Sequence, residues 1–141
     1  MSKAKIYFLL CAVVILFCAS GKTYSQSGGS LYFCEDYKDA KEIGVSERFT
    51  TGWLTVMVRT DKPFGTEKVE LLITQIADKN GNTISEKVID TVPFDIGADW
   101  TYAYFQDKSS LKFTSPGVYR VTLKDLKGIP FCSGEVEIIS K

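Results

Sequence analysis

The chain has no histidine, which removes Ser–His and Cys–His nucleophilic catalysis, histidine-ligated zinc or haem, and imidazole acid–base chemistry. The carboxylates that could act instead are grouped at Asp90, Asp95, Asp99 and Asp107. Asp95 and Asp99 bracket a glycine turn, where they can ligate calcium or serve as a glycosidase acid and base. Their spacing does not match a known calcium loop, and a small domain leaves little room for a substrate cleft. Solvated turn carboxylates are therefore favoured, and we expect no catalytic residue, metal, cofactor or enzymatic activity.

Large aromatic side chains are better candidates, for binding rather than for catalysis. Trp100, Tyr102 and Tyr104 alternate along an expected strand at residues 100–105, so period two places them on one face. Such a row can stack on a sugar ring or a partner protein, but three large rings can equally fill the core of a sandwich. Both interpretations stay open at this point.

Trp53 and Met57 form a second candidate set. They alternate with three aliphatic residues in a strand that β-branched residues and period two predict at residues 52–60. If the aliphatic side of this strand points inward, Trp53 and Met57 point outward. They are then either covered by the segment at residues 35–49 or exposed as a contact patch.

The elements that must position these side chains are short apolar or alternating stretches separated by turn residues. Asn80-Gly81 predicts a hairpin with a tight primed turn, and the charged segment 35–41 is expected to be a loop. The expected strands are residues 31–34, 52–60, 68–76, 83–91, 100–105, 118–123 and 131–139. This pattern indicates an all-β sandwich or barrel.

One part of the chain resembles a known class of domain. The matching residues are Pro116, Gly117, Tyr119, Val121, Asp125, Gly128, Val136 and Ile138. They resemble the last hairpin of bacterial secreted immunoglobulin-like domains, including polycystic-kidney-disease-type and fibronectin-type-III-like modules. The resemblance implies an immunoglobulin-like antiparallel β-sandwich of about seven strands at residues 31–141. It implies a fold rather than a function, because such sandwiches host many unrelated roles.

The N-terminus has the order of a cleavable signal peptide at residues 1–25. Lys3 and Lys5 precede an apolar run at residues 6–19, which is shorter than the roughly 20 residues of a membrane-spanning helix. Cleavage after Gly21 is an alternative, and the bulky residue before Cys18 disfavours lipid attachment. We expect a flexible lead-in at residues 26–30 and a secreted or periplasmic product with no membrane span.

Cys34 and Cys132 are the cysteines that remain after such cleavage, and they can form one disulfide or none. Antibody-type domains join their second and sixth strands, whereas these residues fall in the first and last expected strands. The resemblance implies that the first strand lies beside the last, which favours a Cys34–Cys132 disulfide over two buried thiols.

Charge and composition limit the partners that we expect. Lys and Arg balance Asp and Glu at 17 each, cleavage would remove basic residues only, and no basic cluster appears, so nucleic acid is not expected as a partner. We expect a non-enzymatic binding or structural module, for example an accessory component of a cell-envelope assembly, with a protein or glycan partner there. The alternative is a small carbohydrate-binding or adhesin-like domain that uses an aromatic sheet face.

Overall fold

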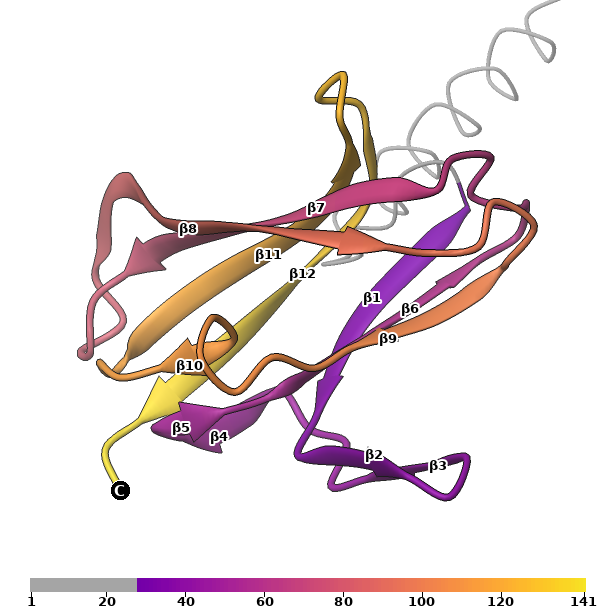
Figure 1. Cartoon of the computed structure of the whole chain (residues 1–141). Helices are drawn as coiled ribbons and strands as arrows, with labels where there is room; N and C mark the ends of the chain where they lie inside the picture. The colour runs from indigo at the N-terminus through magenta and orange to yellow at the C-terminus, as the bar shows by residue number, and fades with distance from the viewer. Residues whose placement is uncertain (1–27) are drawn as a thin grey trace, which may run out of the picture.

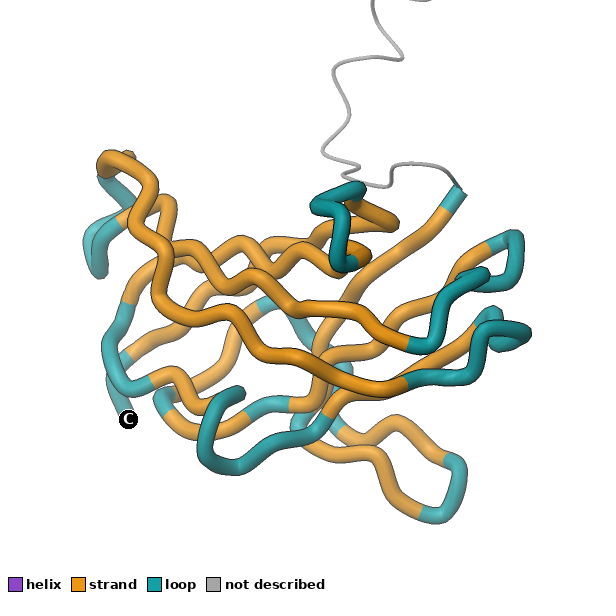
Figure 2. The backbone as a smooth tube through the Cα atoms, turned by 45° about the horizontal axis from the view of Figure 1, so that its top comes forward, coloured by secondary structure: helices purple, strands orange, loops and turns teal. Residues whose placement is uncertain are grey.

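Two β-sheets pack face to face in residues 28–141, the part of the chain that the computed structural model describes (Figure 1). The expected signal peptide at residues 1–25 lies outside the described residues. Residues 28–141 consist of strands joined by loops and contain no helix (Figure 2). Accordingly, residues 28–141 contain no helix of the length and apolar character needed to cross a membrane.

The larger sheet has five strands in the order β4-β12-β11-β7-β8. They are β4 (Arg48–Thr50), β7 (Lys68–Ala77), β8 (Thr83–Asp95), β11 (Gly117–Asp125) and β12 (Pro130–Ile139). The β12–β4 pair is parallel and the other pairs are antiparallel, so the expected antiparallel sandwich has one parallel edge.

The smaller sheet has three antiparallel strands in the order β1-β6-β9. They are β1 (Gly29–Cys34), β6 (Thr55–Thr60) and β9 (Tyr102–Phe105). Two short pairs complete the described part: β2 (Asp36–Lys38) with β3 (Lys41–Ile43), and β5 (Gly52–Trp53) with β10 (Lys112–Phe113). Eight strands thus form the two sheets of the sandwich, seven of them four residues or longer, and the predicted all-β class is confirmed.

Alternation along these strands builds the core. Every second residue of each long strand points between the sheets, where apolar side chains from both sheets meet. Contributors from the smaller sheet are Leu31, Phe33, Val56, Val58, Ala103 and Phe105, and contributors from the larger sheet include Val69, Leu71, Ile73, Tyr119, Val121 and Leu123. The residues between them along β1, β6 and β9 must therefore point to the opposite side of the smaller sheet.

The connection between the two sheets crosses the sandwich. After β8 the chain adds β9 to the smaller sheet and returns as β11 beside β7. The Tyr119 hydroxyl then donates to the Ser115 carbonyl oxygen at 2.7 Å, which is the tyrosine corner that immunoglobulin-like sandwiches show at this point. This contact favours the resemblance seen in the last hairpin, which stays a prediction at the level of a family.

The β7–β8 hairpin is where Asn80-Gly81 predicts it, but its turn is of another type. Gly81 has a φ of 80°, whereas Asn80 is not among the residues with positive φ, so the turn is not a two-residue primed turn. The Asp78 carboxylate accepts the N–H groups of Asn80 and Asn82, both at 2.9 Å, and stabilises a longer turn instead.

Element boundaries differ from the expectation at several points. β1 begins at Gly29, inside the expected lead-in, because it pairs with β6 from that residue. The strand expected at residues 52–60 is divided at Leu54, where the chain passes from β5 to β6. Pro93 lies within β8 rather than ending it, which is possible because β8 is an edge strand and needs no donor on its outer side.

The predicted Cys34–Cys132 disulfide is wrong: both residues are buried free thiols. The first and last strands do lie close together, since a Cβ atom built on Gly134 would be 2.4 Å from the Leu31 carbonyl oxygen. Cys132, however, belongs to the core beside Gly29, where a built Cβ would lie 3.3 Å from the Cys132 Cβ. Cys34 lies five residues beyond Gly29 along β1, which is a distance of roughly 17 Å. A disulfide requires Cα atoms within about 7 Å of each other.

Candidate functional site

The side of the smaller sheet that points away from the core carries a group of aromatic residues. Because β1, β6 and β9 alternate, Tyr32, Met57, Arg59, Tyr102 and Tyr104 all point to this side. In the pairing register Met57 lies between Tyr32 and Tyr104, and Arg59 lies beside Tyr102. We call this set of five residues the outer aromatic face.

A hairpin of β2 and β3 lies against the outer aromatic face, and most of it falls in the segment 35–41 that the sequence predicted to be a loop (Figure 1). The hairpin closes at Lys38 and Lys41 through a two-residue turn. Asp39 and Ala40 in that turn have φ values of 52° and 59°, as a type I′ turn requires. This turn could not be predicted from local sequence, because alanine is unusual in a turn that Asn-Gly or Asp-Gly normally forms.

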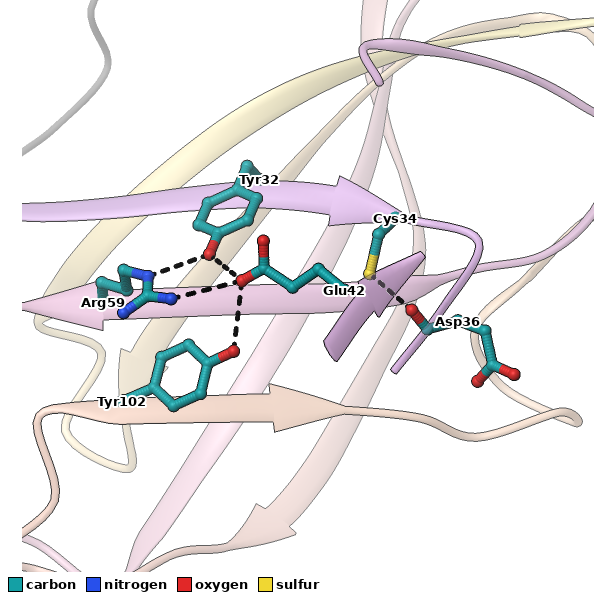
Figure 3. A network of polar contacts seen from close by, with 6 residues as sticks. All are labelled: Tyr32, Cys34, Asp36, Glu42, Arg59 and Tyr102. Carbon is teal, nitrogen blue, oxygen red and sulfur yellow. Dashed lines mark hydrogen bonds and ion pairs between the residues drawn. The ribbon is translucent and has the colours of Figure 1, made fainter. Parts of the chain in front are cut away.

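Glu42 on β3 connects the hairpin to all three strands of the smaller sheet (Figure 3). Its Oε1 atom accepts hydrogen bonds from the Tyr32 hydroxyl and, at 3.1 Å, from the Tyr102 hydroxyl. The Arg59 Nη2 atom forms an ion pair with the same oxygen at 3.4 Å, and Arg59 Nε donates to the Tyr32 hydroxyl oxygen at 3.0 Å. One carboxylate oxygen thus holds groups from three strands.

The titration of these groups reflects the shared carboxylate. The hydrogen bond from Tyr32 holds the pKa of Glu42 below its ordinary value, with further contributions from Tyr102 and Arg59. Burial raises the pKa values of Tyr32 and Tyr102, and their hydrogen bonds to Glu42 raise them further. At neutral pH the site therefore holds an ionised Glu42 and two neutral phenols that donate to it.

Aromatic rings from the hairpin and from β9 pack together in a second part of the site. The Tyr37 ring of β2 lies 4.2 Å from the Tyr104 ring, at an interplanar angle of 31°, and meets the Tyr102 ring edge-on at 6.2 Å. The Arg59 guanidinium lies over the Tyr102 ring, 4.2 Å from its centroid. These contacts hold the rings in a fixed orientation, while Tyr104 keeps 49% of its surface exposed.

A polar pair lies at the edge of the rings. The Gln106 amide follows Tyr104 on the same side of the chain and donates to Asp36 Oδ1 at 2.8 Å and to Thr55 Oγ1 at 2.9 Å. An exposed ring beside a carboxylate and an amide can stack on a flat ligand and hydrogen-bond its edge. Residues 28–141 contain no cluster of three His, Cys, Asp or Glu side chains suited to a metal ion.

Tyr102 and Tyr104 lie together as predicted, but Trp100 does not join them. The core interpretation of this row is wrong, because Ala103 and Phe105 occupy the core side of β9. Trp100 precedes β9 in a loop, with the same 49% exposure as Tyr104, and its indole packs directly over Gly97. The strand begins two residues later than expected, so alternation does not extend to Trp100.

Met57 is fully buried, so its predicted role in an exposed contact patch is wrong. It lies between Tyr32 and Tyr104, both of which touch the hairpin, so its burial favours the alternative that segment 35–49 covers it. Trp53 is separated from Met57 because it belongs to β5. There its exposed ring lies under the Lys108 ammonium, 4.8 Å from the ring centroid.

Sequence reasoning missed six residues of the site, which are Tyr32, Asp36, Tyr37, Glu42, Arg59 and Gln106. Tyr32 and Arg59 could have been found, since alternation in the predicted strands places them opposite the core residues. Tyr37 and Glu42 carried no such signal, because their position depends on the unpredicted hairpin.

No family model and no curated protein matches the sequence. Among solved structures, the chain is similar to the superoxide reductase (neelaredoxin) of Ignicoccus hospitalis, with a TM-score of 0.40 and 14% identity over 81% of this chain and 80% of that one. It is also similar to a β-glucosidase of Listeria innocua in complex with gluconolactone, with a TM-score of 0.41 and 14% identity. That match covers 85% of this chain and 17% of the glucosidase chain. These similarities are too weak to bear on function.

Proposed function

We propose that this protein is a secreted or periplasmic, non-enzymatic binding module that contacts a protein or glycan of the cell envelope through its outer aromatic face. The observation that carries the proposal is the half-exposed Tyr104 ring, which points away from the core and is held in place by Tyr37. An exposed tyrosine that is already ordered loses little conformational entropy when it binds, which is why tyrosine is common in binding surfaces.

Residues next to Tyr104 support a contact made by shape and hydrogen bonds. Arg59 and Glu42 neutralise each other in an ion pair, so the face has no strong net charge that would attract a polyanion. Around the ring lie the Asp36 carboxylate and the Gln106 amide, each of which keeps further hydrogen-bonding capacity.

A carbohydrate-binding or adhesin-like role is the second candidate, and a specific observation favours it. Sugar rings place C–H groups on an aromatic face and hydroxyl groups at their rim, and here Tyr104 lies beside Asp36 and Gln106. A protein partner would use the same ring but would bury more of the surrounding surface, including the rest of the hairpin.

The experiment compares two equally exposed aromatic residues. Wild-type protein, Tyr104→Ala and Trp100→Ala are tested against a glycan panel and against extracted cell-envelope proteins. We expect Tyr104→Ala to weaken the specific interaction at least tenfold, as loss of a central aromatic contact does, and Trp100→Ala to leave it unchanged. Loss of binding in Trp100→Ala alone would place the contact in the loop before β9 and contradict the proposal.

A further inference from the structure

The β2–β3 hairpin differs from every long strand of the fold in how it is held. None of its residues from Asp36 to Lys38 or from Lys41 to Ile43 is buried, and Ile43 is largely exposed. Its strands pair only with each other, in a sheet separate from the sandwich. Segments with few buried apolar groups are those that open at low free-energy cost while the remaining structure stays folded.

Three side chains attach the hairpin to the sandwich. Glu42 binds Tyr32, Arg59 and Tyr102, the Tyr37 ring stacks on Tyr104, and Asp36 accepts a hydrogen bond from Gln106. Glu42 dominates this set, because it receives three of the contacts and is the group that reaches all three strands (Figure 3).

Two side chains that would otherwise be accessible lie on the covered side of the sheet. Met57 is fully buried although it points away from the core, and Cys34 is fully buried although it follows the same alternation. The Cys34 thiol donates to the Asp36 carbonyl oxygen of β2 at 3.3 Å, so the hairpin backbone lies directly against it. Opening of the hairpin would uncover both.

We propose that the β2–β3 hairpin is a cover that opens as a unit from the outer aromatic face, and that Glu42 is the latch that keeps it closed. In the closed state the accessible contact surface consists mainly of Tyr104, Arg59, Tyr37 and the polar pair of Asp36 and Gln106. In the open state Tyr32, Met57 and Tyr102 join Tyr104 in one continuous strip across β1, β6 and β9. The proposal rests on the hairpin contacts alone and does not depend on the proposed function.

The two free thiols provide a built-in measurement of this opening. Cys34 lies under the hairpin, whereas Cys132 lies in the core between the sheets. Alkylation by iodoacetamide in native buffer, followed by peptide mass spectrometry, gives a separate rate for each. We expect Cys34 to react faster than Cys132, because opening of the hairpin requires no unfolding of the sandwich.

Variants then test the latch. In Glu42→Ala we expect alkylation of Cys34 to accelerate about tenfold or more, with the rate of Cys132 unchanged. Glu135→Ala is the matched control: Glu135 has a side-chain exposure of 26% against 23% for Glu42 and pairs with Arg120 in the larger sheet. It should change neither rate.

A variant that changes no charge distinguishes opening of the hairpin from a change in the reactivity of the Cys34 thiol. The Glu42 charge itself raises the pKa of Cys34, after the larger effect of burial, so its removal also makes the thiol more reactive. Tyr102→Phe removes one hydrogen bond to Glu42 without changing any charge and should accelerate Cys34 alkylation about threefold. Equal rates for Cys34 and Cys132 in the wild type, or no acceleration in Tyr102→Phe, would overturn the proposal.

Discussion

Tyr104 and Phe105 are consecutive residues of β9 whose side chains point to opposite sides of the smaller sheet. Phe105 is 2% exposed in the core and packs on Phe94 with ring centroids 4.9 Å apart, whereas Tyr104 is half exposed and touches Tyr37. Replacement of each by alanine makes the same change in strand propensity, so the difference between the two variants reports burial.

The magnitudes follow from what each ring loses. Phe105→Ala removes a buried ring and leaves a cavity, which should lower the free energy of unfolding by about 3 to 5 kcal/mol. Tyr104→Ala loses an aromatic contact worth about 0.5 to 1.5 kcal/mol and only the buried half of its ring, without leaving a cavity in the core, so its cost should be clearly smaller. At about 4 °C per kcal/mol for a domain of this size, Phe105→Ala should melt about 12 to 20 °C lower than the wild type.

Urea unfolding followed by tryptophan fluorescence and far-UV circular dichroism measures both differences on the same protein. Coincident transitions by the two probes would justify a two-state analysis. If Tyr104→Ala costs as much as Phe105→Ala, Tyr104 is a core residue and the orientation of the outer aromatic face is wrong.

Three further predictions concern single groups. Tyr119→Phe should lower the free energy of unfolding by about 1 kcal/mol in urea titrations, because the Ser115 carbonyl loses its donor. Tyr104→Phe should leave the free energy of unfolding unchanged, since the Tyr104 hydroxyl has no partner within residues 28–141. Equal losses in the two variants would contradict the tyrosine corner. Mass spectrometry of unreduced protein denatured in alkylating reagent should find Cys34 and Cys132 both alkylated, whereas a cross-linked peptide pair would refute the placement of the two residues. Because the pKa of Glu42 is lowered in the folded protein, its stabilising contacts are complete above the ordinary glutamate value of 4.5 and are lost as the pH falls through the folded value. As the pH falls, hydrogen exchange at the Glu35 amide, which donates to the Ile43 carbonyl oxygen across the hairpin, should accelerate relative to its intrinsic rate, while the amides of β11 stay protected. The same pH dependence in Glu42→Gln would exclude the Glu42 carboxylate as the cause.

The long strands were predictable because local pattern and burial agree in them. β11 and β12 alternate regularly, β7 does so as far as Ile73, and each strand is within a few residues of its predicted range. Alternation also placed Tyr102 and Tyr104 on one side of β9, but it did not say which side faces the core. That choice depends on Phe105 meeting Phe94 from the other sheet, which is a tertiary contact.

Neither the hairpin nor the relative positions of the two cysteines could be predicted from local sequence, and the reasons for the two failures differ. The turn at Asp39 and Ala40 is stabilised by contacts that Tyr37 and Glu42 make with other strands, so tertiary structure overrides a weak local signal. The disulfide prediction failed on register: the neighbouring strands were the right ones, but Cys34 and Cys132 lie at different heights along them.

Binding through the outer aromatic face can be tested most directly by mapping the contact on the protein itself. Once a glycan or envelope protein is found to bind, ¹⁵N-labelled protein is titrated with it, and amide chemical-shift changes are assigned to residues. The changes should be concentrated in β1, β6, β9 and the β2–β3 hairpin, with the largest near Tyr104. Changes confined to β8, to the loop that carries Trp100 or to the tip of the β11–β12 hairpin would show that another surface binds.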